Sequence, residues 1–438
     1  MDATLLLVIV FGIFFGLLAL GVPIVIALIL ASLSASFMIP NFPANPDFIF
    51  RNMVVVLDST PILAIPLFIL SGNIMAKGGI SEKLFDLFAY GLGTKTGGMP
   101  SAVIITTLFY GSFVGSAPAT VAAVGAMTIP MLVSLGYDKT FSVSMVTVAS
   151  SLAIILPPSV PFIVFGITAG VSIGDLFIAG ILPAIVVAIV MIVYVVCYFK
   201  IRGGEDKELL RANAERLRSK GFARVFRESI FALLAPVIIL GGIYGGIVTP
   251  TEAANISVVY ALIVSVFVYK TLKPREVLDV FVSSSRTIAV ILVIISTATV
   301  FGRVLTLMRA PQQISEALMG IAGDSPVALI MIILAFLIIF GLVMEPLAVI
   351  LITTPIFFPM MTSVGMDPVH FGVIMIFASA IGFVTPPVGM SLFVASSVTG
   401  LPILKIARQT VQFLILLAIV MMLVVFVPEI SLTLVPAR

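Results

Sequence analysis

The sequence predicts an all-helical membrane protein with inverted repeats, each holding a re-entrant hairpin and a broken helix. Three observations support this fold class. The 438-residue chain is 61% hydrophobic and only 10% charged, whereas soluble domains carry about 25% charged residues. Two long apolar segments each contain adjacent prolines, Pro157-Pro158 and Pro386-Pro387. Matching residues also recur at one fixed distance along the chain, as shown below.

Composition excludes several classes of protein. A single cysteine, Cys197, excludes an intrachain disulfide and an all-cysteine metal site, and a single histidine, His370, excludes bis-histidine haem and histidine-cluster zinc. We expect a surface role for His370 and an inert, lipid-facing Cys197. The chain has no phosphate-binding G-x-x-x-x-G-K-[ST] loop, so ATP-driven transport would need a separate ATPase. We expect no cleavable signal peptide and no nucleic-acid partner.

The N-terminal third contains spans, an arm and the first hairpin. Leu5–Met38 is interpreted as one long or kinked span, because two spans would leave almost no turn. Asn41–Asp58 is more polar and is expected to form a surface arm before the span Pro61–Ala76. Gly97–Gly136 is interrupted by small residues at Phe109–Thr120 and is barely long enough for two spans. It therefore predicts a re-entrant hairpin with an irregular tip.

A polar loop sets the predicted orientation. Lys200–Glu228 carries nine basic and five acidic residues, which the positive-inside rule places in the cytoplasm. Its stretch Glu205–Lys220 predicts a short amphipathic helix. Counting spans from this loop places the N-terminus in the cytoplasm and the C-terminus in the periplasm. The other predicted elements are spans at Leu176–Phe199, Ile230–Val248, Ala253–Tyr269, Arg286–Met308 and Val411–Val427, and a second arm at Pro274–Ser284.

The two halves align without gaps across the hairpin and the broken helix. Four matched pairs are each 229 positions apart: Pro130 with Pro359, Gly136 with Gly365, Asp138 with Asp367, and Pro157-Pro158 with Pro386-Pro387. Span counting places the two hairpins on opposite sides of the membrane, so the repeats are inverted, as in alternating-access transporters. The predicted organisation is a scaffold span and arm at 1–60, transport repeat 1 at 61–171 (hairpin 98–136, broken helix 138–171), scaffold spans, loop 200–228 and second arm at 172–285, transport repeat 2 at 286–400 (hairpin 326–364, broken helix 367–399), and a last scaffold span with an external tail at 401–438.

Each hairpin tip is expected to face the proline break of its own repeat. Helix breaks present unpaired carbonyl groups, which suit a hard monovalent cation, and glycines allow close backbone approach. For small residues, close helix packing in lipid is the alternative. The first candidate cation site comprises Gly111, Ser112, Gly115, Ser116, Pro157 and Pro158; the second comprises Gly341, Glu345, Gly382, Thr385, Pro386 and Pro387; the substrate candidates are Thr120, Ser159, Pro346 and Gly389.

Two acidic residues have separate interpretations. Glu345 is the acidic residue at a hairpin tip, where it would pair with a cation or cap the following helix; the sequence leaves both roles open. Glu252 follows Thr249 and Thr251 and is expected to take part in ordinary helix-start chemistry.

Five segments resemble the large membrane subunit of tripartite ATP-independent periplasmic (TRAP) transporters, the DctM-like family. They are Pro66–Ile80, Gly115–Asp138, Leu156–Ser159, Gly241–Ala254 and Gly382–Phe393. The resemblance implies a multi-pass importer of the bacterial inner membrane, not an enzyme, driven by Na+ at the two cation sites through an elevator mechanism. It implies a separate small four-helix membrane subunit, a periplasmic substrate-binding protein, and an organic-acid substrate such as a C4-dicarboxylate, sialic acid or another sugar acid.

Two other functions stay open at this point. One is a stand-alone sodium- or proton-coupled carrier of a related elevator fold, which would need no binding protein. The other is a non-transporting subunit of a membrane enzyme complex, against which the lack of paired histidines and cysteine motifs argues.

Overall fold

The computed structural model describes residues 3–39, 42–323 and 325–436. These residues form helices and connecting turns, with no β-strand among them. Nine helices of this described part are long and apolar enough to cross a membrane, or ten if a bent pair counts as one span. The predicted all-helical membrane fold is confirmed.

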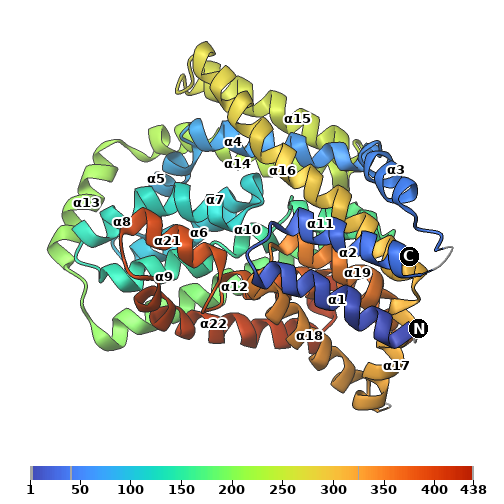
Figure 1. Ribbon diagram of the computed structural model, residues 1–438. Coiled ribbons are helices and arrows are strands. Elements are labelled where there is room, and N and C mark those ends of the chain that lie inside the picture. The colour runs from blue at the N-terminus through green and yellow to red at the C-terminus, as the bar shows by residue number, and fades with distance from the viewer. Residues whose placement is uncertain (1–2, 40–41, 324, 437–438) are drawn as a thin grey trace.

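The N-terminal segment forms two helices rather than one. Helices α1 (Ala3–Ala19) and α2 (Ile24–Met38) reverse direction at a short turn and pack side by side (Figure 1). Gly21 has a φ of +77°, the left-handed conformation that glycine adopts without steric cost. The predicted single long or kinked span is therefore wrong, because the glycine allows a turn tighter than we expected.

The positions of the termini follow from this extra reversal. The two ends of the chain lie at the same end of the molecule, far from helix α13 (Lys207–Ser219) (Figure 1). The predicted sides of the membrane on which the two termini lie stay a prediction.

The first repeat contains the predicted hairpin and broken helix. The hairpin runs through α6 (Gly98–Val114), the tip at Gly115-Ser116, and then α7, the π-helix η2 and α8 without a gap. These last elements are α7 (Ala117–Thr120), η2 (Val121–Gly125) and α8 (Ala126–Ser134). The broken helix consists of α9 (Lys139–Ala149), α10 (Leu152–Ile155) and, after the prolines, α11 (Val160–Ala169).

The second repeat has the same plan. Its hairpin is α18 (Pro326–Val343) and α19 (Pro346–Ser363), and its broken helix is α20 (Pro368–Val384) and α21 (Met390–Thr399). The first hairpin has its base at the end of the molecule near α13, whereas α18 begins at the opposite end beside α17 (Ala310–Ala322) (Figure 1). The repeats are therefore inverted, as predicted.

Local chemistry repeats between the two halves. Asp138 and Asp367 both cap the helix that follows, with their carboxylates accepting hydrogen bonds from backbone amides 2.7–3.1 Å away. Gly136 and Gly365, two residues earlier, have φ values of +89° and +87°. An aspartate N-cap satisfies amides that the first helical turn leaves unpaired. Both broken helices therefore begin in the same way.

The remaining helices surround the repeats. Helix α16 (Pro274–Leu307) is continuous, so the predicted division into an arm ending at Ser284 and a span beginning at Arg286 is wrong. Its proline lies at the first helical position, where it does not interrupt hydrogen bonding. The other elements are α3 (Pro46–Leu57), η1 (Thr60–Leu63), α4 (Ala64–Lys77), α5 (Ile80–Leu92), α12 (Ile173–Arg202), α14 (Phe222–Tyr244), α15 (Pro250–Leu262), the π-helix η3 (Ile263–Val268), α22 (Ile403–Phe426) and α23 (Glu429–Leu432).

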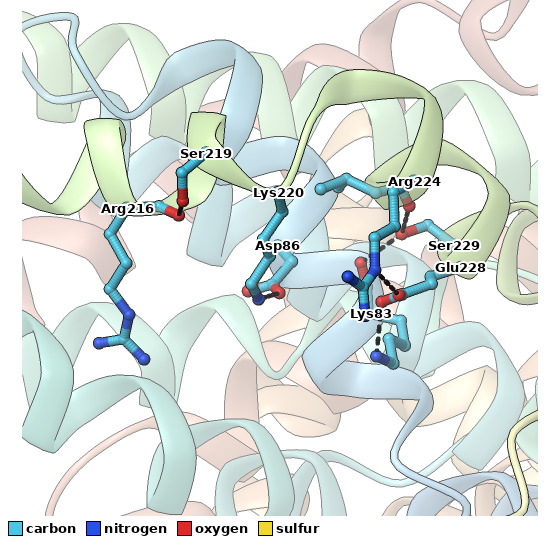
Figure 2. A network of polar contacts seen from close by, with 9 residues as sticks. Lys83, Asp86, Arg216, Ser219, Lys220, Arg224, Glu228 and Ser229 are labelled. Carbon is cyan, nitrogen blue, oxygen red and sulfur yellow. Dashed lines mark hydrogen bonds and ion pairs between the residues drawn. The ribbon is translucent and has the colours of Figure 1, made fainter.

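The polar loop contains the predicted helix, α13, and ion pairs join α5 to the end of α13 and to the first turns of α14 (Figure 2). Lys220 Nζ lies 2.8 Å from an Asp86 carboxylate oxygen, and Lys83 Nζ lies 2.8 Å from Glu228, which also pairs with Arg224 at 3.0 Å. These side chains are partly exposed, so each pair contributes little by itself. Together they hold the polar loop against α5.

A more buried contact joins the loop to the base of the first hairpin. The Glu205 carboxylate accepts hydrogen bonds from the Gly97 amide and the Tyr137 hydroxyl, both at 2.7 Å. Gly97 and Tyr137 lie at the two ends of the hairpin. Burial raises the pKa of Tyr137, and the bond to Glu205 raises it further. The hydroxyl therefore stays protonated and donates at neutral pH.

We expect Glu205→Ala to lower stability by about 2 kcal/mol, since it removes two charge-assisted hydrogen bonds and leaves both donors unpaired. The thermal unfolding temperature of the purified protein measures this effect. Glu208→Ala, in the same loop but exposed, is the matched control and should change the temperature little. Equal unfolding temperatures for the two variants would contradict the assigned role.

Candidate functional site

Each hairpin tip packs against the broken helix of its own repeat, as predicted. A Cβ atom on Gly111 of α6 would lie 2.6 Å from the Ala153 Cα of α10. A Cβ atom on Gly382 of α20 would lie 2.7 Å from the Gly341 Cα of α18. These distances are shorter than real Cβ contacts. Close helix packing, the alternative considered for small residues, thus accounts for Gly111, Gly341 and Gly382.

Both tips line a single cavity of about 210 Å³, which we call the tip cavity. Residues flanking both breaks and two further helices, α4 and α16, complete its wall. The lining residues are Ile69, Asn73, Val114, Gly115, Ser116, Ala117, Pro118, Ala119, Ile154, Val160, Pro161, Thr287, Ile291, Glu345, Pro346, Leu347 and Phe383. Two repeats that enter from opposite ends therefore meet at one site.

Ser116 and Glu345 occupy equivalent positions at the two tips, 229 residues apart. Each is the N-cap residue of the helix that follows its tip, and neither side chain makes a capping hydrogen bond. Helix N-termini favour negative charge, and a buried carboxylate favours a bound cation. The tip cavity therefore offers groups for both an anion and a cation.

The structure does not show side-chain capping by Glu345, one of its two predicted roles. Its carboxylate makes no hydrogen bond or ion pair within the part of the chain that the structure describes. The residue borders the tip cavity, so its oxygens are available to a cation.

Hydroxyl groups at the tips and breaks donate to nearby backbone carbonyls. Ser159 Oγ donates to Ile154 O at 2.6 Å, and Thr385 Oγ1 donates to Ile381 O at 2.6 Å. Ser112 and Thr120 donate in the same way, to Phe109 O and Ser116 O. A hydroxyl that donates keeps its lone pairs for a cation. These bonds therefore leave the predicted ligand role open.

The predicted residues divide into those that line the tip cavity and those that support it. Gly115, Ser116, Glu345 and Pro346 line it. Ser112, Thr120, Ser159, Gly389 and the four break prolines Pro157, Pro158, Pro386 and Pro387 lie outside this lining. Of the four substrate candidates, the tip cavity therefore brings only Pro346 to its surface.

Sequence reasoning missed two polar residues of the site, Asn73 on α4 and Thr287 on α16. Asn73 Nδ2 donates to Ser284 Oγ of α16 at 2.9 Å, which ties the two helices together beside the tip cavity. The signal was present, because Asn73 is an amide within an apolar span and interhelical polar bonds are typical of such residues.

The two remaining polar predictions have different outcomes. Glu252 forms a capping box with Thr249, whose amide lies 2.7 Å from the carboxylate, so helix-start chemistry is confirmed. His370 is only 2% exposed, so the predicted surface role is wrong. The histidine lies in the first turn of α20, which packs against α22 and α23. Cys197 is exposed.

The model of the family described as "Tripartite ATP-independent periplasmic transporter, DctM component" matches residues 11–430. The chain belongs to this family. The DctM family comprises transporter permeases rather than enzymes, and this chain is accordingly a multi-pass membrane subunit for transport.

Named relatives of this DctM chain differ in substrate. The isethionate TRAP transporter permease protein DctMQ of Oleidesulfovibrio alaskensis is 41% identical over 96% of this chain, which spans 65% of that relative's length. The C4-dicarboxylate large permease DctM of Pseudomonas aeruginosa is 37% identical, over 89% of this chain and 90% of the relative. The ectoine large permease TeaC of Halomonas elongata is 32% identical, over 95% and 96%.

Two solved structures share the fold of this DctM chain. The Alcanivorax borkumensis YdaH transporter matches with a TM-score of 0.67 and 12% identity, over 94% of this chain and 99% of YdaH. Neisseria gonorrhoeae MtrF matches with a TM-score of 0.62 and 14% identity, over 91% and 93%. At these identities the likeness concerns the fold alone.

The contact between Gly382 and α18 leads to a prediction. We expect Gly382→Ala to cost about 1–3 kcal/mol, because the added methyl group meets backbone atoms that cannot rotate away. A lower thermal unfolding temperature would show this cost. Gly320→Ala in α17, where the methyl group has no atom within 4 Å, is the control and should be neutral or slightly stabilising. Similar behaviour of both variants would argue against close packing at Gly382.

Proposed function

We propose that this DctM-family chain is the large permease subunit of a sodium-coupled importer of a small organic acid. One observation carries the proposal: two inverted hairpin tips meet at one cavity that holds a carboxylate and two helix N-termini. Broken helices and re-entrant tips at membrane depth are the usual setting for coupled ion and substrate sites.

Two Na+ ions would bind in this proposal, one at each pairing of tip and break. The first would use oxygens near Gly111, Ser112, Gly115, Ser116 and the Pro157-Pro158 break. The second would use Glu345, Thr385 and backbone near Gly341, Gly382 and the Pro386-Pro387 break. The organic acid would lie between the ions, where the positive ends of α7 and α19 and the bound cations offset its charge.

The proposed substrate is a small organic acid, and no single compound is selected. Relatives are named for isethionate, C4-dicarboxylates and ectoine, so family membership does not select one. A cavity of about 210 Å³ suits a small acid, and C4-dicarboxylates fit this description well. Sialic and other sugar acids remain in the test panel.

The proposed mechanism is an elevator, in which hairpins and broken helices move together against the remaining helices. A periplasmic binding protein would deliver the acid, and a small membrane subunit would complete the scaffold. The isethionate relative is named DctMQ and extends well beyond the matched region, so a small subunit linked to the permease would be an alternative arrangement. With α13 in the cytoplasm by the positive-inside rule, both ends of the chain would face the periplasm.

Uptake into proteoliposomes tests the proposal. The chain and its small partner are reconstituted and offered succinate, isethionate, ectoine and sialic acid, with and without binding protein and an inward Na+ gradient. Uptake that requires both components is the expected result. Uptake that needs no binding protein would favour the stand-alone carrier, and uptake without a Na+ gradient would overturn sodium coupling.

The hydroxyls of Ser116 and Thr385 give a sharper test. Ser116→Ala and Thr385→Val should each raise the Na+ concentration for half-maximal uptake by about threefold to tenfold, since a lost oxygen ligand costs about 1 kcal/mol. Ser134→Ala, at the base of the first hairpin, is the control, because its hydroxyl is exposed and bonds only to Met131 O. Unchanged sodium dependence in both tip and break variants would remove these residues from the sites.

A further inference from the structure

A second, larger cavity lies beside the tip cavity. It has a volume of about 480 Å³, and we call it the Arg303 cavity after its charged lining residue. Its wall comes from the arm helix α3, the segment leading into α4, and helices α11, α16 and α19. The lining residues are Val55, Val56, Ser59, Ile62, Ile65, Val164, Ile167, Thr168, Ile295, Thr299, Gly302, Arg303, Thr306, Leu351 and Pro355.

The two cavities adjoin each other along four helices. On each of α4, α11, α16 and α19, the linings of the two cavities lie three or four residues apart, which is one helical turn of about 5.4 Å. The pairs, with the tip-cavity residue first, are Ile69 and Ile65, Pro161 and Val164, Ile291 and Ile295, and Leu347 and Leu351. The two cavities are therefore neighbours along the same four helices.

The polar groups of the Arg303 cavity are hydroxyls and one guanidinium. Hydroxyls of Ser59, Thr168, Thr299 and Thr306 line it together with the guanidinium of Arg303, and its lining contains no carboxylate. The hydroxyl oxygen of Ser59 is buried without a hydrogen-bond partner among the described residues. A buried polar group without a partner is unusual in a folded protein and points to a missing ligand or water.

The Arg303 guanidinium has hydrogen-bond donors that the described residues do not use. It lies in the last turns of α16, near the end of a membrane helix, and donates to the Asn52 side-chain oxygen of α3. Within the described residues it forms no ion pair. A guanidinium has five N–H donors in a planar fork, which matches the paired oxygens of a carboxylate or sulfonate. An arginine in a membrane-spanning helix is costly and is usually retained for function.

We propose that the Arg303 cavity is a first binding site for the carboxylate or sulfonate group of the transported acid. Arg303 binds the anionic group, the surrounding hydroxyls add hydrogen bonds, and the acid then moves one helical turn deeper to the tip cavity. Arg303 also selects against cationic solutes at the entrance. This inference rests on the proposed transport of an organic acid, but it concerns residues outside the tip cavity.

The test uses the charge of a small reagent and needs no transport. Cys197→Ser removes the native thiol, and Thr306→Cys adds one inside the cavity, one turn from Arg303 on the same helix face. The reconstituted full chain, with its small subunit, is treated with sulfonatoethyl methanethiosulfonate, an anion, and trimethylammonioethyl methanethiosulfonate, a cation. The ratio of their modification rates reports the local charge.

We expect Arg303→Gln to lower the anion-to-cation rate ratio by at least about threefold, as the loss of a nearby charge at this range predicts. Arg309→Gln, at the same end of α16 but outside the lining, is the control and should leave the ratio nearly unchanged. Succinate or isethionate should also slow modification by the anionic reagent when Arg303 is present. If Thr306→Cys fails to fold, Thr299→Cys provides a second reporter in the same cavity.

An unchanged ratio in Arg303→Gln, or no protection by either acid, would overturn the proposed site. These outcomes separate it from the proposed function. If sodium-coupled uptake fails while the ratio and the protection depend on Arg303, the anion site stands without the sodium mechanism. If uptake occurs and the ratio does not depend on Arg303, the anion enters by another route.

Discussion

The structure depends on one constraint: backbone amides and carbonyls cannot be left unpaired in hydrocarbon. A helix that breaks at membrane depth must have its break enclosed by protein or must lack free donors. The first break, Leu156–Ser159, is buried throughout, whereas Pro387 and Val388 of the second are exposed. Proline has no amide donor, so adjacent prolines reduce the number of donors that exposure would leave unpaired. Each hairpin packs against the broken helix of its own repeat, and both tips line one cavity.

The two repeats match closely in backbone structure, but the side chains at their tips differ. The offset of 229 holds through both tips and both aspartate caps, and then increases by one, so that the N-caps Ser159 and Gly389 are 230 apart. At the tips, Ser116 in one repeat corresponds to Glu345 in the other. The two tips therefore present a neutral hydroxyl and a carboxylate to the same cavity. Two cation sites built on these tips would differ in charge, and so in affinity.

The sequence was sufficient to predict the elements with strong local signals. The hairpin tips, the proline breaks, the aspartate-capped starts and the helix in the polar loop depend on nearby residues and on a repeat visible in the sequence. The turn at Gly21 and the continuity of α16 were mispredicted, because span length alone cannot distinguish a tight reversal from a kink, or an arm from the start of a long helix. The sequence marks Asn73 as a polar residue in an apolar span, but the positions of Asn73 and Arg303 at the two cavities depend on which helices pack together. The burial of His370 likewise comes from α22 and α23, which lie distant in the chain.

Arg303 at the larger cavity and Glu345 at the tip cavity give an electrostatic reason why a cation would be needed for anion transport. Arg303 lies beside the larger cavity, and Glu345 lies at the smaller one, with the same four helices lining both. An organic acid attracted by Arg303 would next meet the Glu345 carboxylate, and like charges at close range repel. A cation bound at Glu345 removes that repulsion, so the acid would fill the tip cavity only when the cation is present. In this arrangement the coupling of anion to cation follows from electrostatics, with the helix N-terminus at Glu345 contributing to the binding of the acid once its carboxylate is neutralised.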